Sequence, residues 1–106
     1  MTSSNRRLTF THRAESDLRE ILQYSLDMWG AERRDAYAKT LANAIDRIAT
    51  FPMLGQARHE LGSDVRSIAA GMHQFFYRVT DAEIVVIRIA HNRQDQLDID
   101  RDMSAQ

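Results

Sequence analysis

The chain has 106 residues, 43% of them hydrophobic and 27% charged, and a net charge of −1, which fits one globular domain and argues against bulk attraction to nucleic acid. It has no cysteine, so disulfides, thiolate metal sites and cysteine nucleophiles are excluded. Because no apolar run approaches the roughly 18 residues that cross a membrane, and residues 1–10 lack the apolar stretch of a signal peptide, we expect a cytoplasmic protein.

The N-terminal part of the chain is predicted to form a short strand and a long amphipathic helix. Apolar and polar residues alternate over residues 7–10, which indicates a strand. Apolar residues then recur at three- and four-residue spacing as far as about Trp29, which is typical of one helix face. Thr11 is a suitable N-cap, and we expect Gly30 to end the helix in a left-handed conformation.

A second helix is predicted over residues 31–50, because the helical spacing resumes there and Pro52 stops it. The two helices should form a hairpin, since only a glycine separates them. Residues 53–64 have no clear period and are predicted as a loop with room for one turn of helix.

The C-terminal part of the chain changes to the two-residue period of strands. Strands are predicted over residues 65–69, 73–79 and 84–90, with tight turns that make neighbours antiparallel. The order β-α-α-β-β-β predicts an α+β fold, with a helical hairpin packed on one face of a mainly antiparallel sheet. The first strand could join either edge. We expect a single domain over residues 1–106, with a core of about residues 7–93.

Charge is distributed unevenly along the chain. Residues 94–106 carry four aspartates and one arginine, so this acidic tail has a net charge of −3 and residues 1–93 have +2. Only Lys39 is a lysine, so 13 of the 14 basic residues are arginine. Arginine suits bidentate contacts with phosphate or carboxylate, although an arginine-rich genome would leave the same bias.

The alternation of strand side chains predicts which residues lie on the sheet face that the helices leave open. Apolar residues at alternate positions of the last strand are assigned to the helix face: Val85, Ile87 and Ile89. The residues assigned to the open face combine arginine with apolar groups: Arg66, Phe76, Arg78, Val86 and Arg88. Such a surface suits an amphipathic helix of a partner or a nucleic acid, and a solvated sheet face is the alternative interpretation.

No strong catalytic motif is present. The sequence has no phosphate-binding loop, no nucleophile elbow and no metal-ligand spacing among its four histidines, so no metal or cofactor is predicted. Glu60, Arg66 and His91 are candidates for the base, the phosphate clamp and the acid of RNA cleavage, although nothing in their spacing requires them to meet. His91 could equally cap a strand, and Glu60 could be surface charge.

Several short segments occur in a recognisable order. They are an Ala-x-x-Asp-Leu-x-x-Ile helix from Ala14 to Ile21, the pair Trp29 and Gly30, a helix with Tyr37 and Leu41 that ends near Phe51-Pro52-x-x-Gly55, Val65-Arg66-Ser67, Phe-Tyr-Arg-Val from Phe76 to Val79, and an ending from Ile87 to His91 with Arg93 and Asp95. Their order and spacing resemble the ParE branch of the RelE/ParE toxin superfamily over nearly the whole chain.

The resemblance implies a toxin of a type II toxin–antitoxin system, a class associated with plasmid stabilization. Such toxins form hetero-oligomers with a ParD-like antitoxin. The complex represses its own operon, and it contacts DNA only through the antitoxin. ParE-like members inhibit DNA gyrase and are not enzymes. RelE-like relatives are instead ribosome-dependent mRNA endoribonucleases, for which Arg66 and His91 stand where catalytic residues are expected.

This sequence departs from the nuclease pattern. Arg58, His59 and Glu60 stand where nucleases have a lysine-rich stretch, and the tail is acidic. Both differences favour gyrase as the target, and an attenuated family member that only binds antitoxin is a further alternative. Residues expected to bind the target or the antitoxin, at the arginine face or the helical hairpin, are Arg66, Phe76, Arg78, Val86, Arg88, His91 and Arg93.

Overall fold

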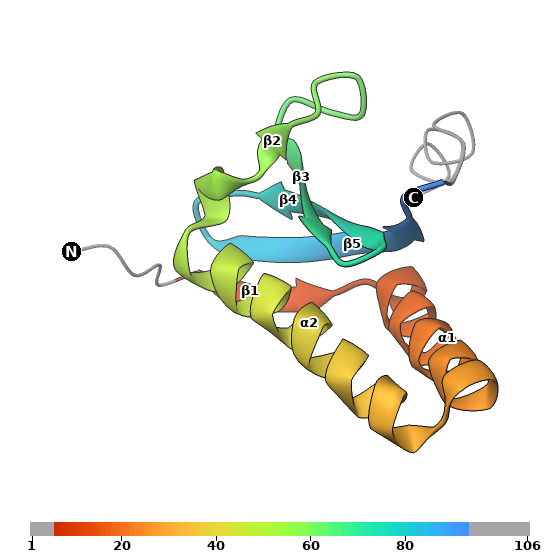
Figure 1. The fold of residues 1–106 in the computed structure, drawn as a ribbon. Coiled ribbons are helices and arrows are strands. Elements are labelled where there is room, and N and C mark those ends of the chain that lie inside the picture. The colour runs from red at the N-terminus through yellow and green to blue at the C-terminus, as the bar shows by residue number, and fades with distance from the viewer. Residues whose placement is uncertain (1–5, 94–106) are drawn as a thin grey trace.

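The computed structural model describes residues 6–93 (Figure 1). The elements in chain order are β1 (Arg7–Phe10), α1 (His12–Trp29), α2 (Ala31–Thr50), the 3-10 turn η1 (Pro52–Leu54), β2 (Gln56–Ala57), β3 (Val65–Ala70), β4 (His73–Val79) and β5 (Glu83–His91). The predicted α+β order is confirmed, and the predicted loop contains η1 and the short β2. The acidic tail, residues 94–106, lies outside the described residues.

The five strands form one sheet in the order β1-β5-β4-β3-β2. β1 pairs with β5 in parallel, with Leu8 opposite Ile84 and Phe10 opposite Val86, whereas the other pairs are antiparallel. The first strand therefore joins the edge formed by β5. Both helices lie on the same side of the sheet (Figure 1).

The helices begin and end where the sequence provides caps. The Thr11 hydroxyl accepts a hydrogen bond from Ala14 N at 3.0 Å, which caps α1. Gly30 has φ 91° and ψ 172°, so its φ is positive as expected but its ψ is extended rather than left-handed helical. Gly30 donates its N–H to Leu26 O and accepts from Arg34 N, so one residue closes α1 and opens α2.

The core lies between the helical hairpin and the sheet. Its helical members are small or aliphatic residues that make close contact: Ala14, Leu41, Ala44 and Ile48. Its strand members, two of which are aromatic, are Ala70, Phe75, Tyr77, Ile84, Val86 and Ile89. Each large apolar side chain that is fully buried stabilises the fold by about 1.5–3 kcal/mol relative to exposure.

A β-bulge in β5 changes which of its residues face the helices. Phe76 pairs with Arg88, but Tyr77 pairs with Val86, so Ile87 is an extra residue. Val86, like Ile84 before it, is fully buried in the core, so the prediction that Val86 lies on the open face was wrong. Val85 stands opposite Arg78 on the other face, again contrary to prediction. The prediction assumed one unbroken alternation of side chains along β5, whereas the alternation shifts by one residue at the bulge.

Candidate partner-binding groove

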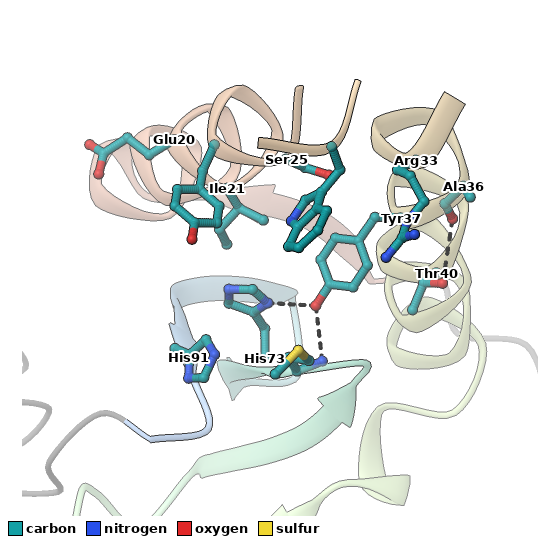
Figure 2. Close-up of a pocket in the computed structure, with 12 residues that line it drawn as sticks. Glu20, Ile21, Ser25, Arg33, Ala36, Tyr37, Thr40, His73 and His91 are labelled. Atoms are coloured by element: carbon teal, nitrogen blue, oxygen red, sulfur yellow. Dashed lines mark hydrogen bonds between the residues drawn. The ribbon is translucent and has the colours of Figure 1, made fainter. Parts of the chain in front are cut away.

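An apolar groove of about 670 Å³ lies between the two helices and the adjacent ends of β4 and β5 (Figure 2). The α1 residues that line it include Ile21, Tyr24 and Trp29, and α2 contributes Tyr37. Tyr24, Trp29 and the neighbouring Met72 are 61%, 58% and 54% exposed, although all three are large apolar side chains. The groove thus exposes aromatic surface that the core does not cover.

The sequence contained a partial signal for this groove. The apolar stripe of α1 continues through Tyr24 to Trp29, but the sheet does not extend far enough to bury it. Helical spacing by itself predicts that Tyr24, Trp29 and Tyr37 all pack against other parts of the fold. Tyr37 does pack against the core, whereas Tyr24 and Trp29 remain open to solvent. Arg33 lies over the Trp29 ring at 5.1 Å, which adds a cation–π contact at the rim.

Three polar side chains form the floor of the groove. The Tyr37 hydroxyl lies 2.6 Å from His73 Nδ1 and accepts a hydrogen bond from Met72 N at 2.9 Å. His73 and His91 stand opposite each other on β4 and β5, with ring centroids 5.3 Å apart and the rings nearly perpendicular. Burial lowers the pKa of His73, as does the nearby His91, while Asp17 acts in the opposite direction. Burial also raises the pKa of Tyr37, against the effect of the Met72 hydrogen bond.

Arg66, predicted on the open face, lies on the helix side of the sheet. It pairs across the strands with Tyr77, whose side chain is in the core. Its guanidinium donates to the backbone carbonyls of Gly55 at 2.8 Å and Met53 at 3.3 Å. Tyr77 holds the same segment, because its hydroxyl donates to Pro52 O at 2.7 Å and accepts from Gly55 N at 3.0 Å. Arg66 therefore secures η1 against the sheet.

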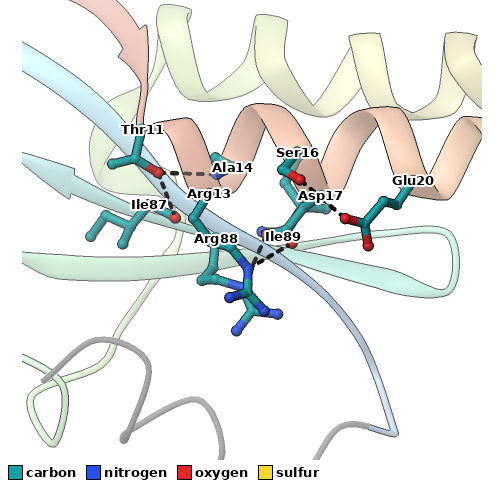
Figure 3. A network of polar contacts seen from close by, with 9 residues as sticks. All are labelled: Thr11, Arg13, Ala14, Ser16, Asp17, Glu20, Ile87, Arg88 and Ile89. Carbon is teal, nitrogen blue, oxygen red and sulfur yellow. Dashed lines mark hydrogen bonds and ion pairs between the residues drawn. The ribbon is translucent and has the colours of Figure 1, made fainter. Parts of the chain in front are cut away.

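Arg88 is also not a surface residue. It is only 4% exposed and donates from Nε to Asp17 Oδ2 on α1 at 2.9 Å (Figure 3). The same oxygen accepts a hydrogen bond from Ile89 N at 2.9 Å, and Arg13 Nε donates to Oδ1 at 3.2 Å. Arg88 was expected to bind a partner at an exposed face, but a substitution such as Arg88→Glu would act first on the fold.

Phe76 and Arg78 keep the positions that were predicted on the open face. Arg88 pairs with Phe76 and so shares that face, but it is buried rather than exposed. Residues 58–64 cover part of the same face. Leu61 packs against Phe76, and Arg58 lies over the Phe76 ring at 5.2 Å. Arg78 pairs with Asp64 at 3.1 Å. The surface expected to bind a partner is thus partly occupied by the chain itself.

The predicted nuclease residues are separated. His91 is level with His73 on β4, whereas Arg66 is level with Tyr77, four positions along the strand or about 13 Å away. Glu60 is exposed and bonded to Arg58 at 2.8 Å, a hydrogen bond that lowers the pKa of Glu60. The described geometry does not place these residues around one phosphate.

His91 is the one candidate site residue that lines the groove. Its Nδ1 accepts a hydrogen bond from Arg93 N at 3.0 Å, and the Arg93 side chain is exposed. Over residues 6–93, no three histidine or acidic side chains gather as a metal site. Neither described helix has the length and apolar character needed to cross a membrane.

Comparison with known proteins gives consistent matches. The sequence profile described as "ParE toxin of type II toxin-antitoxin system, parDE" matches residues 8–96. Toxin ParE1 of Mycobacterium tuberculosis is 38% identical over 91 residues, which are 85% of this chain and 90% of that protein. Toxin ParE1 of Caulobacter vibrioides is 38% identical over 81 residues, 76% of this chain and 83% of the relative.

Two solved structures share the fold. A chain of the chromosomal ParDE TA system from P. aeruginosa has a TM-score of 0.69 at 20% identity, with 81% of this chain and 95% of that chain covered. A chain of the toxin–antitoxin complex RelBE2 from Mycobacterium tuberculosis has a TM-score of 0.59 at 22% identity, with 86% and 95% covered. Both therefore share the overall fold of this chain.

Proposed function

Because the chain belongs to the ParE toxin family of type II toxin–antitoxin systems, we propose that it inhibits DNA gyrase in the cytoplasm and is neutralised by a ParD-like antitoxin. It acts by binding proteins rather than by cutting RNA. The antitoxin forms a hetero-oligomer with it and supplies the contact with DNA.

The exposed aromatic groove is the observation that carries this proposal. Contiguous apolar surface on a small protein marks a place where another molecule binds, and aromatic residues are enriched in the centres of protein interfaces. Tyr24, Trp29 and Met72 provide such a surface at the helical hairpin. We assign this groove to a segment of the antitoxin. The solved relatives support an antitoxin partner, because both are described as toxin–antitoxin assemblies.

Gyrase is preferred to messenger RNA as the target because the nuclease residues are not assembled. Arg66 is bonded to two backbone carbonyls, and His91 lies at the far end of the sheet from it. A phosphate clamp needs donors that are free to meet the phosphate, together with an acid within reach. The chain has neither arrangement among its described residues.

The proposal is tested by inducing the full chain in bacteria and adding the purified protein to a DNA supercoiling assay. We expect growth arrest, loss of gyrase supercoiling with cleaved DNA trapped, and intact messenger RNA. The antitoxin encoded in the same operon should restore both growth and supercoiling. Arrest with normal supercoiling and cleaved messenger RNA would contradict gyrase as the target, and growth without arrest would mean that toxicity has been lost.

A further inference from the structure

Each of the two histidines on the groove floor has one ring nitrogen, Nδ1, in a hydrogen bond within the protein. His91 Nδ1 accepts the N–H of Arg93 at 3.0 Å, so a neutral His91 must carry its proton on Nε2. Within the described part of the chain, no hydrogen-bond partner contacts Nε2 of either His73 or His91. His91 therefore presents an N–H donor that the fold itself does not use.

The contact with Tyr37 gives His73 the same tautomer as His91. The Tyr37 hydroxyl has a single proton and already accepts from Met72 N, so it donates either to His73 Nδ1 at 2.6 Å or to Ala70 O at 3.4 Å. The shorter distance identifies His73 Nδ1 as the acceptor. A neutral His73 then also carries its proton on Nε2. Two adjacent rings on paired strands thus provide N–H donors at a groove whose walls are mostly apolar (Figure 2).

We propose that His73 and His91 form a carboxylate-binding pair, and that the antitoxin segment in the groove carries an acidic side chain next to its apolar anchor. This inference rests on the proposed function, because it specifies the chemistry of the partner at the same groove. The carboxylate accepts the two Nε2–H donors, and the apolar anchor covers the aromatic rings of the helices. Charge-assisted hydrogen bonds of this kind are about twice as strong as neutral ones.

The charged groups around the pair favour an anion. From α2, Arg33 lines the groove next to Tyr37. From α1, Glu20 also lines it, but its carboxylate is directed away from the histidine rings in Figure 2. Asp17 acts on His73 but is bound to Arg13 and Arg88. Arg93 follows His91 on the chain. No negative group other than Glu20 therefore lines the groove among the described residues.

A carboxylate should make binding dependent on pH. An imidazolium ion attracts a carboxylate more strongly than a neutral imidazole does, so affinity should rise as pH falls through the range in which histidine titrates. Two charged rings 5.3 Å apart repel each other, and an anion that accepts hydrogen bonds from both offsets that repulsion. A neutral amide in the same place would accept the hydrogen bonds but would show little pH dependence.

The first test measures the affinity of the full chain for the antitoxin of the same operon by calorimetry at pH 8 and pH 6. We expect binding to tighten by about tenfold, the equivalent of one unit of pKa difference. The double variant His73→Gln/His91→Gln should lose this dependence, while Arg33→Gln keeps it. Tight binding that is independent of pH and unaffected by the histidine changes would overturn the inference and leave the antitoxin proposal intact. No binding at either pH would overturn both.

A second test varies the ligand. A peptide that copies the groove-binding segment of the antitoxin is compared at pH 6 with a copy in which its acidic residues are changed to the matching amides. We expect the amide copy to bind about tenfold more weakly, and equal binding would rule out carboxylate recognition.

The acidic tail of the chain itself is another possible source of carboxylates. The full chain with Asp95, Asp98, Asp100 and Asp102 changed to Asn separates the two sources. If these changes alone alter the titration of His73 and His91 in nuclear magnetic resonance spectra of the free protein, the groove binds the tail and the proposal fails. Unaltered titration supports the antitoxin as the source.

Discussion

Asp17 replaces a strand partner that β5 lacks along part of its edge. β1 ends at Phe10, opposite Val86, and beyond that point α1 lies beside β5. The Thr11 hydroxyl donates to Ile87 O at 2.9 Å, and the Asp17 carboxylate accepts from Ile89 N. Buried backbone groups need such partners, because leaving one without a hydrogen bond costs about 1–3 kcal/mol. Asp17, a charged residue of α1, therefore supplies the hydrogen-bond acceptor that a neighbouring strand would otherwise provide to Ile89 N.

We expect Asp17→Asn to destabilise the fold by on the order of 3 kcal/mol, because the buried Arg88 loses the charge of the Asp17 carboxylate. Urea unfolding followed by circular dichroism measures this change. Arg13→Gln is the matched control, since Arg13 is about half exposed and its pairing with the same carboxylate should contribute less than about 1 kcal/mol. Equal losses for the two variants would show that the Asp17–Arg88 contact contributes little.

His73 should make stability depend on pH even without a partner. Its pKa is lowered in the folded protein, mainly by burial, so the unfolded chain binds a proton at a higher pH than the folded chain does. The stabilisation is fully present above the ordinary histidine pKa of about 6.5 and is lost as pH falls below it. Thermal unfolding at pH 7.5 and pH 5.5 should show a smaller difference for His73→Gln than for the wild type. His12→Gln changes a fully exposed histidine and should retain the wild-type difference.

At the scale of elements, Gly30 is the residue that allows two helices to follow each other directly. Its combination of φ 91° and ψ 172° is essentially restricted to glycine. Because no atom lies within 4 Å of an added Cβ, a substitution there changes backbone strain without creating a clash. The angle between the helices, and with it one wall of the groove, depends on this residue.

Gly30→Ala should lower the free energy of unfolding by about 1–3 kcal/mol. Gly30→Asn should cost a similar amount, because asparagine tolerates the left-handed helical region but not an extended ψ at positive φ. Denaturant titration of both variants distinguishes the two conformations. A clearly more stable asparagine variant would indicate that the junction is left-handed helical, as first expected from the sequence.

At the scale of the whole molecule, the groove exists because the helical hairpin extends beyond the sheet. The helices cover the core residues of β4 and β5 and then continue past the sheet (Figure 1). Tyr24 and Trp29, toward the end of α1, are therefore left exposed. On the opposite side of the sheet, Leu61 and Arg58 cover Phe76. The apolar surface available to a partner is therefore concentrated at the hairpin.

Trp29→Ala should weaken antitoxin binding by about 30-fold, the effect of a typical interface hot spot. Because Trp29 is 58% exposed, its loss should change stability little. Phe51→Ala is the matched control, since Phe51 is a comparably exposed aromatic residue that does not line the groove. Affinity measured by calorimetry should remain unchanged for the control, and equal weakening of both variants would argue against the groove as the docking site.

The helices and strands were predictable because their signals are local. Thr11 and Gly30 define the ends of α1, Pro52 follows α2, and the change from a helical to a two-residue period marks the strands. These patterns depend on neighbours a few positions apart, and the same residues identified the toxin family. Family membership in turn made an antitoxin the expected partner.

Only the tertiary structure decided which residues are available for binding. The bulge at Ile87 reverses the exposure of Val86, and the phase of a strand beyond a bulge depends on its pairing rather than on its own alternation. Arg88 is buried because a carboxylate 71 positions away neutralises it. The groove depends on where helices and strands end relative to one another. The sequence by itself determined the two helices, the longer strands and the family, while contacts between distant segments decided the short strand β2 and the exposed surface.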